Sequence, residues 1–302
     1  MHIHILGSAA GGGFPQWNCN CANCGGLRRG EIKAQARTQS SIAISADERR
    51  WLLINASPDI RAQINAFAPL QPQQGVRGTG IAAILLVDSQ IDHTTGLLML
   101  REGSRLELYG TPRVREDLTA HLPLLTILSH YCGVNWHDLP LRESFEIAQV
   151  PGLRFTAVPL ISKAPPYSPH RATPQAGDNI GLWIEDLRTG GKLFYAPGLG
   201  RMEPHLEDYL AQADCLLLDG TTWTEDEMIR VGAGSKLASE MGHLPLAGPH
   251  GLLALLKHYP RPRKILIHIN NTNAILDENT AERALLAAQD VEVAWDGMEI
   301  EC

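Results

Sequence analysis

Short apolar runs alternate along the first half of this chain with segments whose apolar residues recur at helical spacing. Strands are predicted at 1–6, 40–45, 50–55, 81–87 and 105–110, and helices at 59–67, at 94–101 and after Thr111-Pro112. Strands 40–45 and 50–55 are expected to pair with each other. The secondary-structure pattern of the segment 122–150 is less clear, so no element is assigned to it.

The second half repeats this alternation. Strands are predicted near 153–160, 179–186, 191–196, 214–219, 264–269 and 291–295, and helices after Pro204, at 249–258 and at 278–288. Two successive halves of mixed strands and helices favour two sheets packed face to face with helices outside. The predicted fold is α+β, a four-layer αββα sandwich, and residues 1–302 are expected to form a single domain.

Composition and charge limit the class of protein, its cellular location and its partners. With 302 residues, 44% of them hydrophobic, the chain can bury a large core. No apolar run approaches the roughly 20 residues of a membrane span, and residues 1–6 lack the long apolar centre of a signal peptide. We therefore expect a cytoplasmic protein without membrane insertion. A net charge of −7 argues against a nucleic-acid partner.

Three of the six cysteines, Cys19, Cys21 and Cys24, lie within one short segment. In a reducing cytoplasm such a cluster favours a metal site over a disulfide framework, with free thiols as the alternative. Structural zinc takes four nitrogen or sulfur ligands, so three thiolates need a fourth ligand from elsewhere in the chain. We predict a structural zinc here. The glycine-rich segment 7–13 fits no phosphate-binding motif and is expected to pass closely under a metal site.

The segment Asp88-Ser89-Gln90-Ile91-Asp92-His93 lies between an apolar strand and helical spacing, and open α/β folds place their ligands in such loops. His268 ends another apolar strand. Asp92, His93 and His268 together would form a 2-His-1-carboxylate arrangement, which suits non-haem iron(II) and oxygen chemistry. The alternatives are a hydrogen-bonded surface histidine at 93 and a capped core histidine at 268.

A further histidine, His243, lies in a glycine-rich stretch ahead of a helical segment. We assign it to the same site, as a polar wall or as an acid. Fewer sequence features support this assignment than support the assignment of the three candidate ligands.

Five longer motifs occur in order along the chain, namely Gln16-Trp17-Asn18-Cys19 and the segments 53–61, 217–221, 241–243 and 268–273. They resemble the pyrroloquinoline quinone (PQQ) biosynthesis B family of the metallo-β-lactamase superfamily, over nearly the whole chain. The cysteine cluster resembles the zinc knot of that superfamily's ribonuclease-Z-like and phosphodiesterase-like branch. The resemblance implies a metallo-β-lactamase-like αββα sandwich with an N-terminal zinc knot and a role in PQQ biosynthesis.

The resemblance also implies that much of the superfamily's two-metal site is missing. Its first two histidines fall at Asp88 and Gln90, its third falls at Ser162, and its bridging aspartate falls in 195–198, where there is no carboxylate. Asp92, His93 and His268 remain as the active-site metal ligands. Asp88 is a further candidate ligand for the metal or a bound water, and Asp219 is expected to support the site from behind.

Relatives supply the fourth ligand of the zinc knot as a histidine at the position of Asn271. Three alternatives follow for this chain. The fourth ligand lies elsewhere, is a water, or is Asn271 itself at a longer distance.

Three functions are consistent with these features. The first is oxygen-dependent hydroxylation or oxidation of the tyrosine-derived ring of a PQQ precursor by a mononuclear non-haem iron oxidoreductase. The second is a non-catalytic carrier involved in transport of PQQ or its precursor to the periplasm, and the third is a metal-dependent hydrolase. The active-site ion is predicted to be Fe²⁺, although a purified sample could carry Zn, Mn, Mg or Cu.

The expected partners are a PQQ precursor or PQQ, with other proteins of the pathway as candidates. Such precursors carry several carboxylates, which cationic side chains bind as charge-assisted pairs. Arg230 and Lys236, in the segment 228–236, are the predicted substrate-binding cations. The alternative is a solvated lid with two ordinary surface charges.

Overall fold

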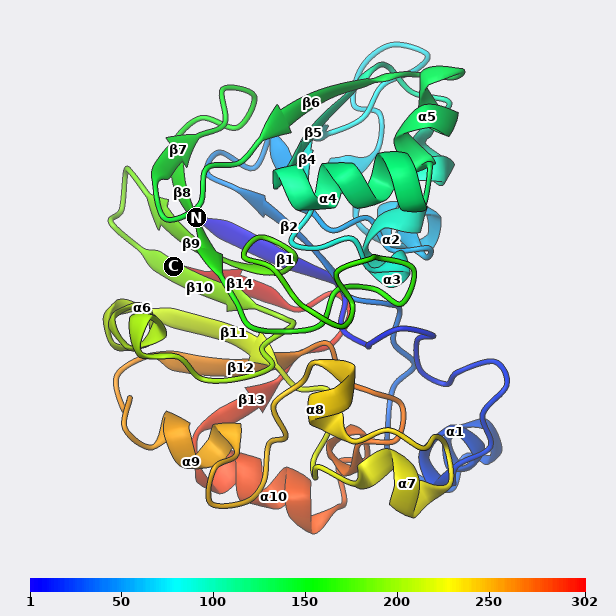
Figure 1. Ribbon diagram of the computed structural model, residues 1–302, viewed down its shortest axis with the longest axis vertical. Helices are drawn as coiled ribbons and strands as arrows, with labels where there is room; N and C mark the ends of the chain where they lie inside the picture. Colours follow the sequence, from blue (N-terminus) through cyan, green and yellow to red (C-terminus); the bar gives the residue numbers. More distant parts are fainter.

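Two seven-stranded sheets form the body of the structure, a computed structural model that describes residues 1–302. The strand orders are β14-β1-β2-β3-β4-β5-β6 and β13-β12-β11-β10-β9-β8-β7 (Figure 1). The strands are β1 His2–Gly7, β2 Ser41–Ser45, β3 Trp51–Ile54, β4 Ile81–Leu85, β5 Leu106–Gly110, β6 Val134–Asp138, β7 Ser144–Glu146, β8 Leu153–Pro159, β9 Ile180–Asp186, β10 Lys192–Ala196, β11 Cys215–Asp219, β12 Arg263–Ile267, β13 Val291–Val293 and β14 Glu299–Glu301.

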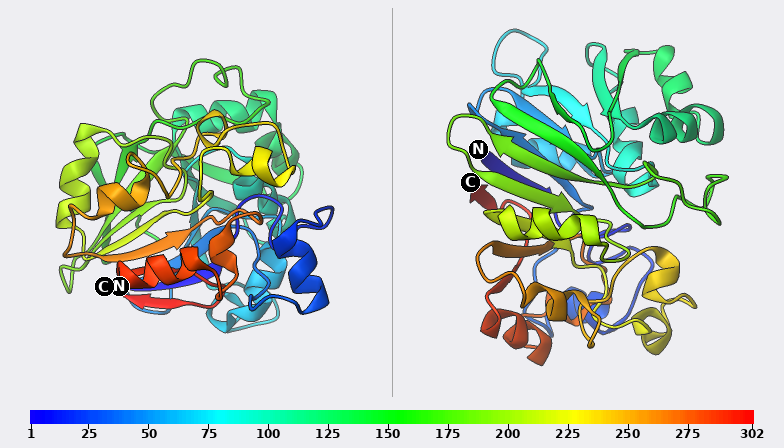
Figure 2. Two further views of the ribbon diagram at one scale, coloured as in Figure 1. Left: turned by 90° about the horizontal axis from the view of Figure 1, so that it is seen from below. Right: turned by 60° about the vertical axis from the view of Figure 1, so that its left-hand side comes forward.

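Each sheet is mixed. In the first, β3, β4, β5 and β6 run parallel to one another, and in the second, β10 to β13 do so. The last strand, β14, returns to pair with the first, so that the two chain ends lie side by side (Figure 2). The Met1 ammonium contacts the Asp186 carboxylate at 2.6 Å and the Cys302 carbonyl at 2.6 Å. Both chain ends are thereby tied to the second sheet.

Short helices cover the outer faces of both sheets. The α-helices are α1 Ala22–Arg29, α2 Ile60–Ala66, α3 Ile91–Thr94, α4 Pro112–Glu116, α5 Leu124–Ser129, α6 Glu207–Gln212, α7 Glu227–Val231, α8 Ala238–Met241, α9 Leu252–Leu256 and α10 Ala281–Ala288. Residues of α2, α4 and α5 join one outer core cluster, and residues of α6, α9 and α10 join another. The four layers of the predicted αββα sandwich are therefore confirmed.

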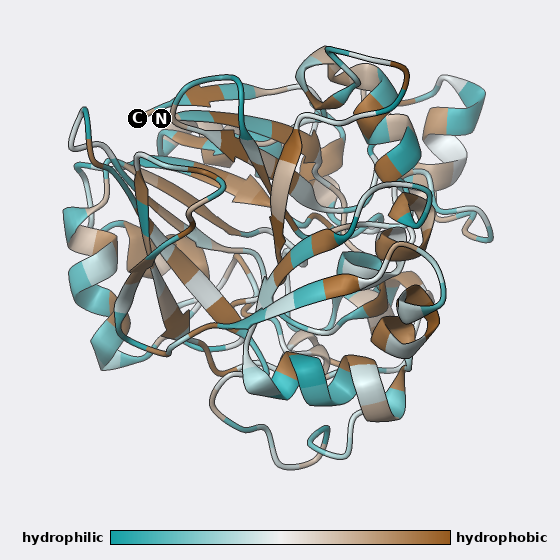
Figure 3. Ribbon diagram, turned by 90° about the horizontal axis from the view of Figure 1, so that it is seen from above, coloured by the Kyte–Doolittle hydropathy of each residue, from teal (hydrophilic) through white to brown (hydrophobic).

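The strands are apolar on both faces because each sheet packs between two layers. In β3, Leu52 and Ile54 belong to the cluster between the sheets, whereas Trp51 and Leu53 face the helices outside. The same alternation occurs along β11. Figure 3 shows the brown, hydrophobic strands in the interior of the molecule. A strand buried on both faces has a continuous apolar run, the pattern from which most strands were predicted.

Several elements differ from the sequence predictions. The predicted helix 94–101 is instead α3 followed by a 3₁₀ segment, Thr95–Leu100. The unassigned segment 122–150 contains α5, β6 and β7, and the helix predicted at 249–258 is shorter. Strand β6 was missed because its residues are only partly buried or exposed, so its polar sequence, VNWHD, lacks an apolar run.

The carboxyl ends of β4, β11 and β12 meet at one end of the sandwich. The loops that follow these strands carry Asp88 to His93, Gly220 with Thr221, and His268. The pairing of β11 with β12 and the packing of the two sheets thus gather side chains that are far apart in sequence. None of the helices is both long and apolar enough to cross a membrane.

Candidate metal centre

Asp92, His93 and His268 lie together at this end of the sandwich. Asp92 and His93 are on the short helix α3, which begins directly after the loop that follows β4. His268 is the first residue after β12 and has a φ of 58°, a left-handed conformation that is uncommon for a residue with a side chain. This conformation is a local strain that the surrounding contacts must maintain, and such strain is concentrated at functional sites.

The three side chains present their ligand atoms to one point. His268 Nε2 lies 3.4 Å from Asp92 Oδ2, and His93 Nε2 lies 3.9 Å from the same oxygen. Metal–ligand bonds of about 2.1 Å place neighbouring ligand atoms about 3.0–3.4 Å apart, close to these separations. His93 is 2% exposed and its Nε2 has no hydrogen-bond partner. The geometry therefore fits a metal ion bound by two imidazoles and one carboxylate.

Asp88 holds the far side of the His93 ring. Its two carboxylate oxygens lie 2.8 and 2.9 Å from His93 Nδ1, and one of them accepts the backbone N–H of Gln90 at 2.9 Å. Burial lowers the pKa of His93, but the Asp88 and Asp92 carboxylates outweigh it and raise that pKa to about 9. The structure thus places Asp88 behind His93, away from the three converging ligand atoms.

Thr221 has the corresponding position behind His268. Its hydroxyl lies 2.9 Å from His268 Nδ1, 3.1 Å from His243 Nδ1 and 2.6 Å from Asp219 Oδ1. If the hydroxyl donates to the carboxylate, it can accept the His268 Nδ1–H, which leaves the His268 Nε2 lone pair free. Thr221 was not predicted as a site residue, because a single threonine after an apolar strand has no distinguishing pattern.

Asp219, His243 and His268 form a second group of potential ligands that shares one histidine with the first. The Thr221 hydroxyl already occupies the space between these three side chains. Both Asp219 oxygens are also engaged, since they accept the backbone N–H groups of Thr221 and Leu199 at 2.9 and 3.1 Å. This group is therefore a hydrogen-bonded network that supports the first set.

His243 forms part of the wall of the site. Its ring is stacked on that of His268, with centroids 5.2 Å apart, and its Nδ1 lies 2.6 Å from Asp219 Oδ2. Burial lowers the pKa of His243, but the Asp219 carboxylate raises it above its usual value. Its Nε2 makes no hydrogen bond within the protein and can face a ligand.

A cavity of about 220 Å³ opens over the ligand set, and its lining includes Arg171 and Asn179 from the loop between β8 and β9. The glycine-rich segment passes against the same site: a Cβ at Gly11 would lie 3.2 Å from Asp92 Oδ2. The expected close approach of this loop is therefore present.

The predicted substrate cations, Arg230 and Lys236, do not line this cavity. Arg230 lies near the end of α7, its side chain is 65% exposed, and its nearest carboxylate is Asp226 at 4.0 Å. Lys236 is also exposed. The structure therefore does not bring these two predicted cations to the cavity, since both side chains extend into solvent.

Gln90 and Ser162, two of the three positions at which the superfamily's histidines are missing, form loop contacts. The Gln90 amide donates to the Lys163 carbonyl at 3.0 Å, and the Ser162 hydroxyl donates to the Gly242 carbonyl at 2.7 Å. Both contacts fasten the loop between β8 and β9 beside the metal ligands. A second metal position is not formed at these residues.

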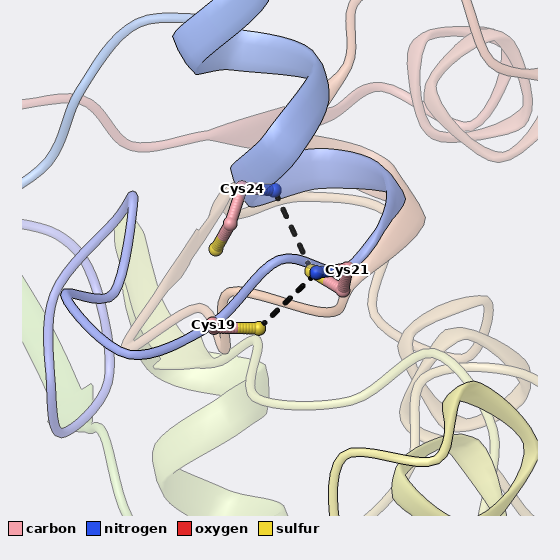
Figure 4. Close-up of side chains that lie close together, drawn as sticks. All are labelled: Cys19, Cys21 and Cys24. Carbon is pink, nitrogen blue, oxygen red and sulfur yellow. Dashed lines mark hydrogen bonds between the residues drawn. The ribbon is translucent and has the colours of Figure 1, made fainter.

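Cys19, Cys21 and Cys24 form a second candidate site, on the N-terminal loop and the first turn of α1. Their sulfur atoms lie within 4.8 Å of one another. Figure 4 shows the backbone N–H of Cys21 directed at Cys19 Sγ and that of Cys24 directed at Cys21 Sγ, each at 3.5 Å. Such backbone hydrogen bonds stabilise thiolates, the form in which cysteine binds a metal.

Asn271 closes the open side of the cysteine cluster. The nitrogen of its side-chain amide lies 3.1, 3.8 and 3.3 Å from the sulfurs of Cys19, Cys21 and Cys24. A rotation of the amide by half a turn exchanges its oxygen and nitrogen, so its oxygen can occupy the same place. The Asn271 carbonyl also accepts the Asn23 side-chain amide at 3.1 Å. The loop that carries His268 is thus attached to the cysteine cluster.

Comparisons with known proteins identify the fold and the family. The family described as the beta-lactamase superfamily domain matches residues 50–269. A crystal structure of Zn²⁺-bound PqqB from Methylobacterium extorquens superposes with a TM-score of 0.92, at 41% identity and full coverage of both chains. A diphosphatase of the PhnP family, 20% identical with a TM-score of 0.69 over 99% of this chain and 96% of that one, shares the fold.

The fold and the match to the family model define a protein of the metallo-β-lactamase superfamily. Coenzyme PQQ synthesis protein B of Methylobacillus flagellatus is 60% identical over 99% of both chains, and that of Pseudomonas fluorescens strain SBW25 is 61% identical over both full lengths. This chain belongs to the coenzyme PQQ synthesis protein B family. Its membership assigns it a role in PQQ biosynthesis.

Proposed function

We propose that this protein binds one active-site metal ion through Asp92, His93 and His268 and hydroxylates or oxidises the tyrosine-derived ring of a PQQ precursor. The proposal rests chiefly on the buried His93 Nε2, which has no hydrogen-bond partner and lies 3.9 Å from Asp92 Oδ2. A buried polar atom without a partner needs an explanation, and a metal ion satisfies it. Family membership supports the pathway.

An iron(II) ion bound by two histidines and one carboxylate retains open coordination positions and supplies oxygen chemistry. The protein's own contribution is orientation and proton handling. Asp88 and Thr221 hold the outer nitrogens of His93 and His268, which directs both Nε2 atoms into the cavity. His243, held by Asp219, keeps a titratable nitrogen at the wall of the cavity, where it can exchange a proton with a ring hydroxyl.

The cysteine cluster is proposed to hold a structural zinc with Asn271 as its fourth ligand. The convergence of the Asn271 amide on all three sulfurs supports this assignment over a distant ligand or a water. The Zn²⁺-bound relative from Methylobacterium extorquens supports a zinc-binding family. Four protein ligands leave no open position, so the role of this ion would be to stabilise the fold.

A hydrolase is less well supported. Two-metal hydrolysis uses a pair of ions to clamp the attacking and leaving oxygens. Here Ser162 and Gln90 contact backbone carbonyls, and the second group of potential ligands is filled by the Thr221 hydroxyl. A single ligand set remains.

The test is anaerobic reconstitution of the metal-depleted protein with iron(II), addition of a precursor that carries the tyrosine-derived ring, and then addition of oxygen. Oxygen uptake and a mass increase or loss of hydrogen in the precursor are expected. Alanine at Asp92, His93 or His268 should abolish turnover, whereas His258→Ala, at an exposed histidine remote from the site, should not. If the iron-loaded wild type binds the precursor, consumes no oxygen and returns it unchanged, the carrier function replaces the oxidase.

A further inference from the structure

The loop between β8 and β9, residues 160–179, forms one wall of the metal-site cavity. Figure 1 shows this green loop passing between α3 and α8. Its contacts on both sides are hydrogen bonds, from the Gln90 amide to the Lys163 carbonyl and from the Ser162 hydroxyl to the Gly242 carbonyl. The Thr111 hydroxyl donates to the Gly177 carbonyl at 2.6 Å near the other end of the loop. Side chains on this loop are therefore held in a defined position over the site.

Arg171 brings a cation into this wall without a carboxylate partner. Its guanidinium donates to the Ala164 carbonyl at 2.6 Å and to the Glu240 carbonyl at 3.2 Å. Burial alone shifts the pKa of Arg171, lowering it from its usual value, and no neighbouring carboxylate raises it. A guanidinium has five N–H donors, so several remain for a ligand.

Asn179 lines the same cavity, and the nitrogen of its side-chain amide, Nδ2, has no hydrogen-bond partner. Asn179 is 4% exposed. A buried amide nitrogen without an acceptor is unfavourable unless a ligand supplies one. One cavity is thus lined by a cation that has no carboxylate partner and by a buried amide nitrogen that has no acceptor.

We propose that Arg171 and Asn179 form a carboxylate-binding subsite of the metal cavity. This inference rests on the proposed function and specifies its substrate class: an aromatic compound whose ring faces the metal ligands while one carboxylate pairs with Arg171. Planar guanidinium groups bind carboxylates with two parallel hydrogen bonds, which fixes orientation as well as charge. The same subsite would discriminate against ring compounds without an acid group.

Binding to zinc-loaded full-length protein tests the subsite, because zinc has no redox chemistry and binding is then measured without turnover. The probes are L-3,4-dihydroxyphenylalanine and dopamine, which share a catechol and an amine and differ by one carboxylate. Titration calorimetry would measure both affinities in the wild type, in Arg171→Gln, and in Arg230→Gln as the matched control. Arg230 is an exposed arginine that does not line the cavity.

The wild type is expected to prefer the carboxylated probe. Arg171→Gln should weaken that probe about tenfold or more, the effect of about 1.4 kcal/mol, and leave dopamine unchanged. Arg230→Gln should change neither affinity. Asn179→Asp, which places a negative charge at the subsite, should also remove the preference while dopamine still binds.

Three results would overturn the subsite. They are equal affinities of the wild type for the two probes, an unchanged preference in Arg171→Gln, and an equal loss of both probes in that variant. Carboxylate selectivity that depends on Arg171, in a protein that shows no oxygen-dependent turnover, would instead retain the subsite and reject the oxidase. The two proposals can therefore fail separately.

Discussion

The Asp88 carboxylate forms a hydrogen bond with Nδ1 of His93, and its two oxygens lie 2.8 and 2.9 Å from that nitrogen. When a metal displaces the second ring proton, this contact keeps the remaining proton on Nδ1 and leaves the Nε2 lone pair directed at the metal position beside Asp92. A carboxylate in this position raises the basicity of a metal-binding imidazole and fixes its ring. Asp88 therefore accounts for one orientation in the site without itself being placed among the ligand atoms.

Asp88→Asn should weaken binding of the active-site metal by about 10- to 100-fold, the usual effect of removing such a supporting carboxylate. Chelator competition on the metal-depleted protein would measure the loss. Asp226→Asn, at an exposed carboxylate on the surface, is the control and should bind metal normally. An unchanged affinity in Asp88→Asn would show that the contact with His93 does not support metal binding.

The raised pKa of His93, about 9, predicts the pH dependence of metal loading. At pH 7 the metal-free ring is protonated between two carboxylates, so an incoming ion must displace that proton. Apparent affinity should therefore rise with pH, by about tenfold per unit below pH 9 for one displaced proton. Measurements at pH 6.5, 7.5 and 8.5 would test this. Asp88→Asn should flatten the profile, because without that carboxylate the His93 pKa moves back toward about 6.5.

The parts of the site that could be predicted from sequence are those encoded locally. Asp92 and His93 are adjacent after an apolar strand, and the three cysteines lie within six residues. Arg171 and Asn179 could not be found, because a long loop has no periodicity and its path over the cavity depends on contacts with distant residues. Arg230 was named from its charge, which the sequence shows, whereas the direction of its side chain into solvent at the end of α7 depends on the fold.

The fold was largely predictable for a related reason. Strands buried on both faces, such as β4 and β11, have continuous apolar runs that are easy to read. Partly exposed elements lack such runs, and β6 was missed for that reason. The pairing of β14 with β1 joins the two ends of the chain, which no local pattern encodes.

Each Cys→Ser change in the cysteine cluster should lower both bound zinc and thermal stability, because metal binding to the folded state contributes to folding free energy. The active-site metal should bind more weakly as well. His268 and Asn271 lie three residues apart on one loop, and Asn271 contacts the cluster, so loss of the zinc would loosen a ligand of the other site. Metal analysis and thermal unfolding of the three variants would test both effects. Cys132→Ser, outside both sites, is the control, and unchanged zinc in all three variants would contradict the assignment.

The fourth position of the cluster can be tested through Asn271 itself. Asn271→Ala should lower zinc affinity, whereas Asn271→His should restore or exceed it, because imidazole is a better partner for zinc beside thiolates than an amide oxygen. X-ray absorption would report three sulfurs and one oxygen in the wild type and three sulfurs and one nitrogen in the histidine variant. Wild-type affinity in Asn271→Ala would place the fourth ligand elsewhere.

Thr221→Val removes one hydroxyl at almost constant volume and therefore isolates the contact behind His268. The hydroxyl lies 2.9 Å from His268 Nδ1 and 2.6 Å from Asp219 Oδ1. Valine therefore removes one hydrogen-bond partner from each of these two buried groups. An unsatisfied buried group costs about 1–3 kcal/mol, which urea unfolding of the metal-depleted protein would detect. We also expect metal affinity to fall about tenfold, since the His268 ring loses the acceptor that orients it. Thr221→Ser keeps the hydroxyl and should retain most of the metal affinity. If Thr221→Val binds the metal as tightly as the wild type does, orientation of His268 by the Thr221 hydroxyl is refuted.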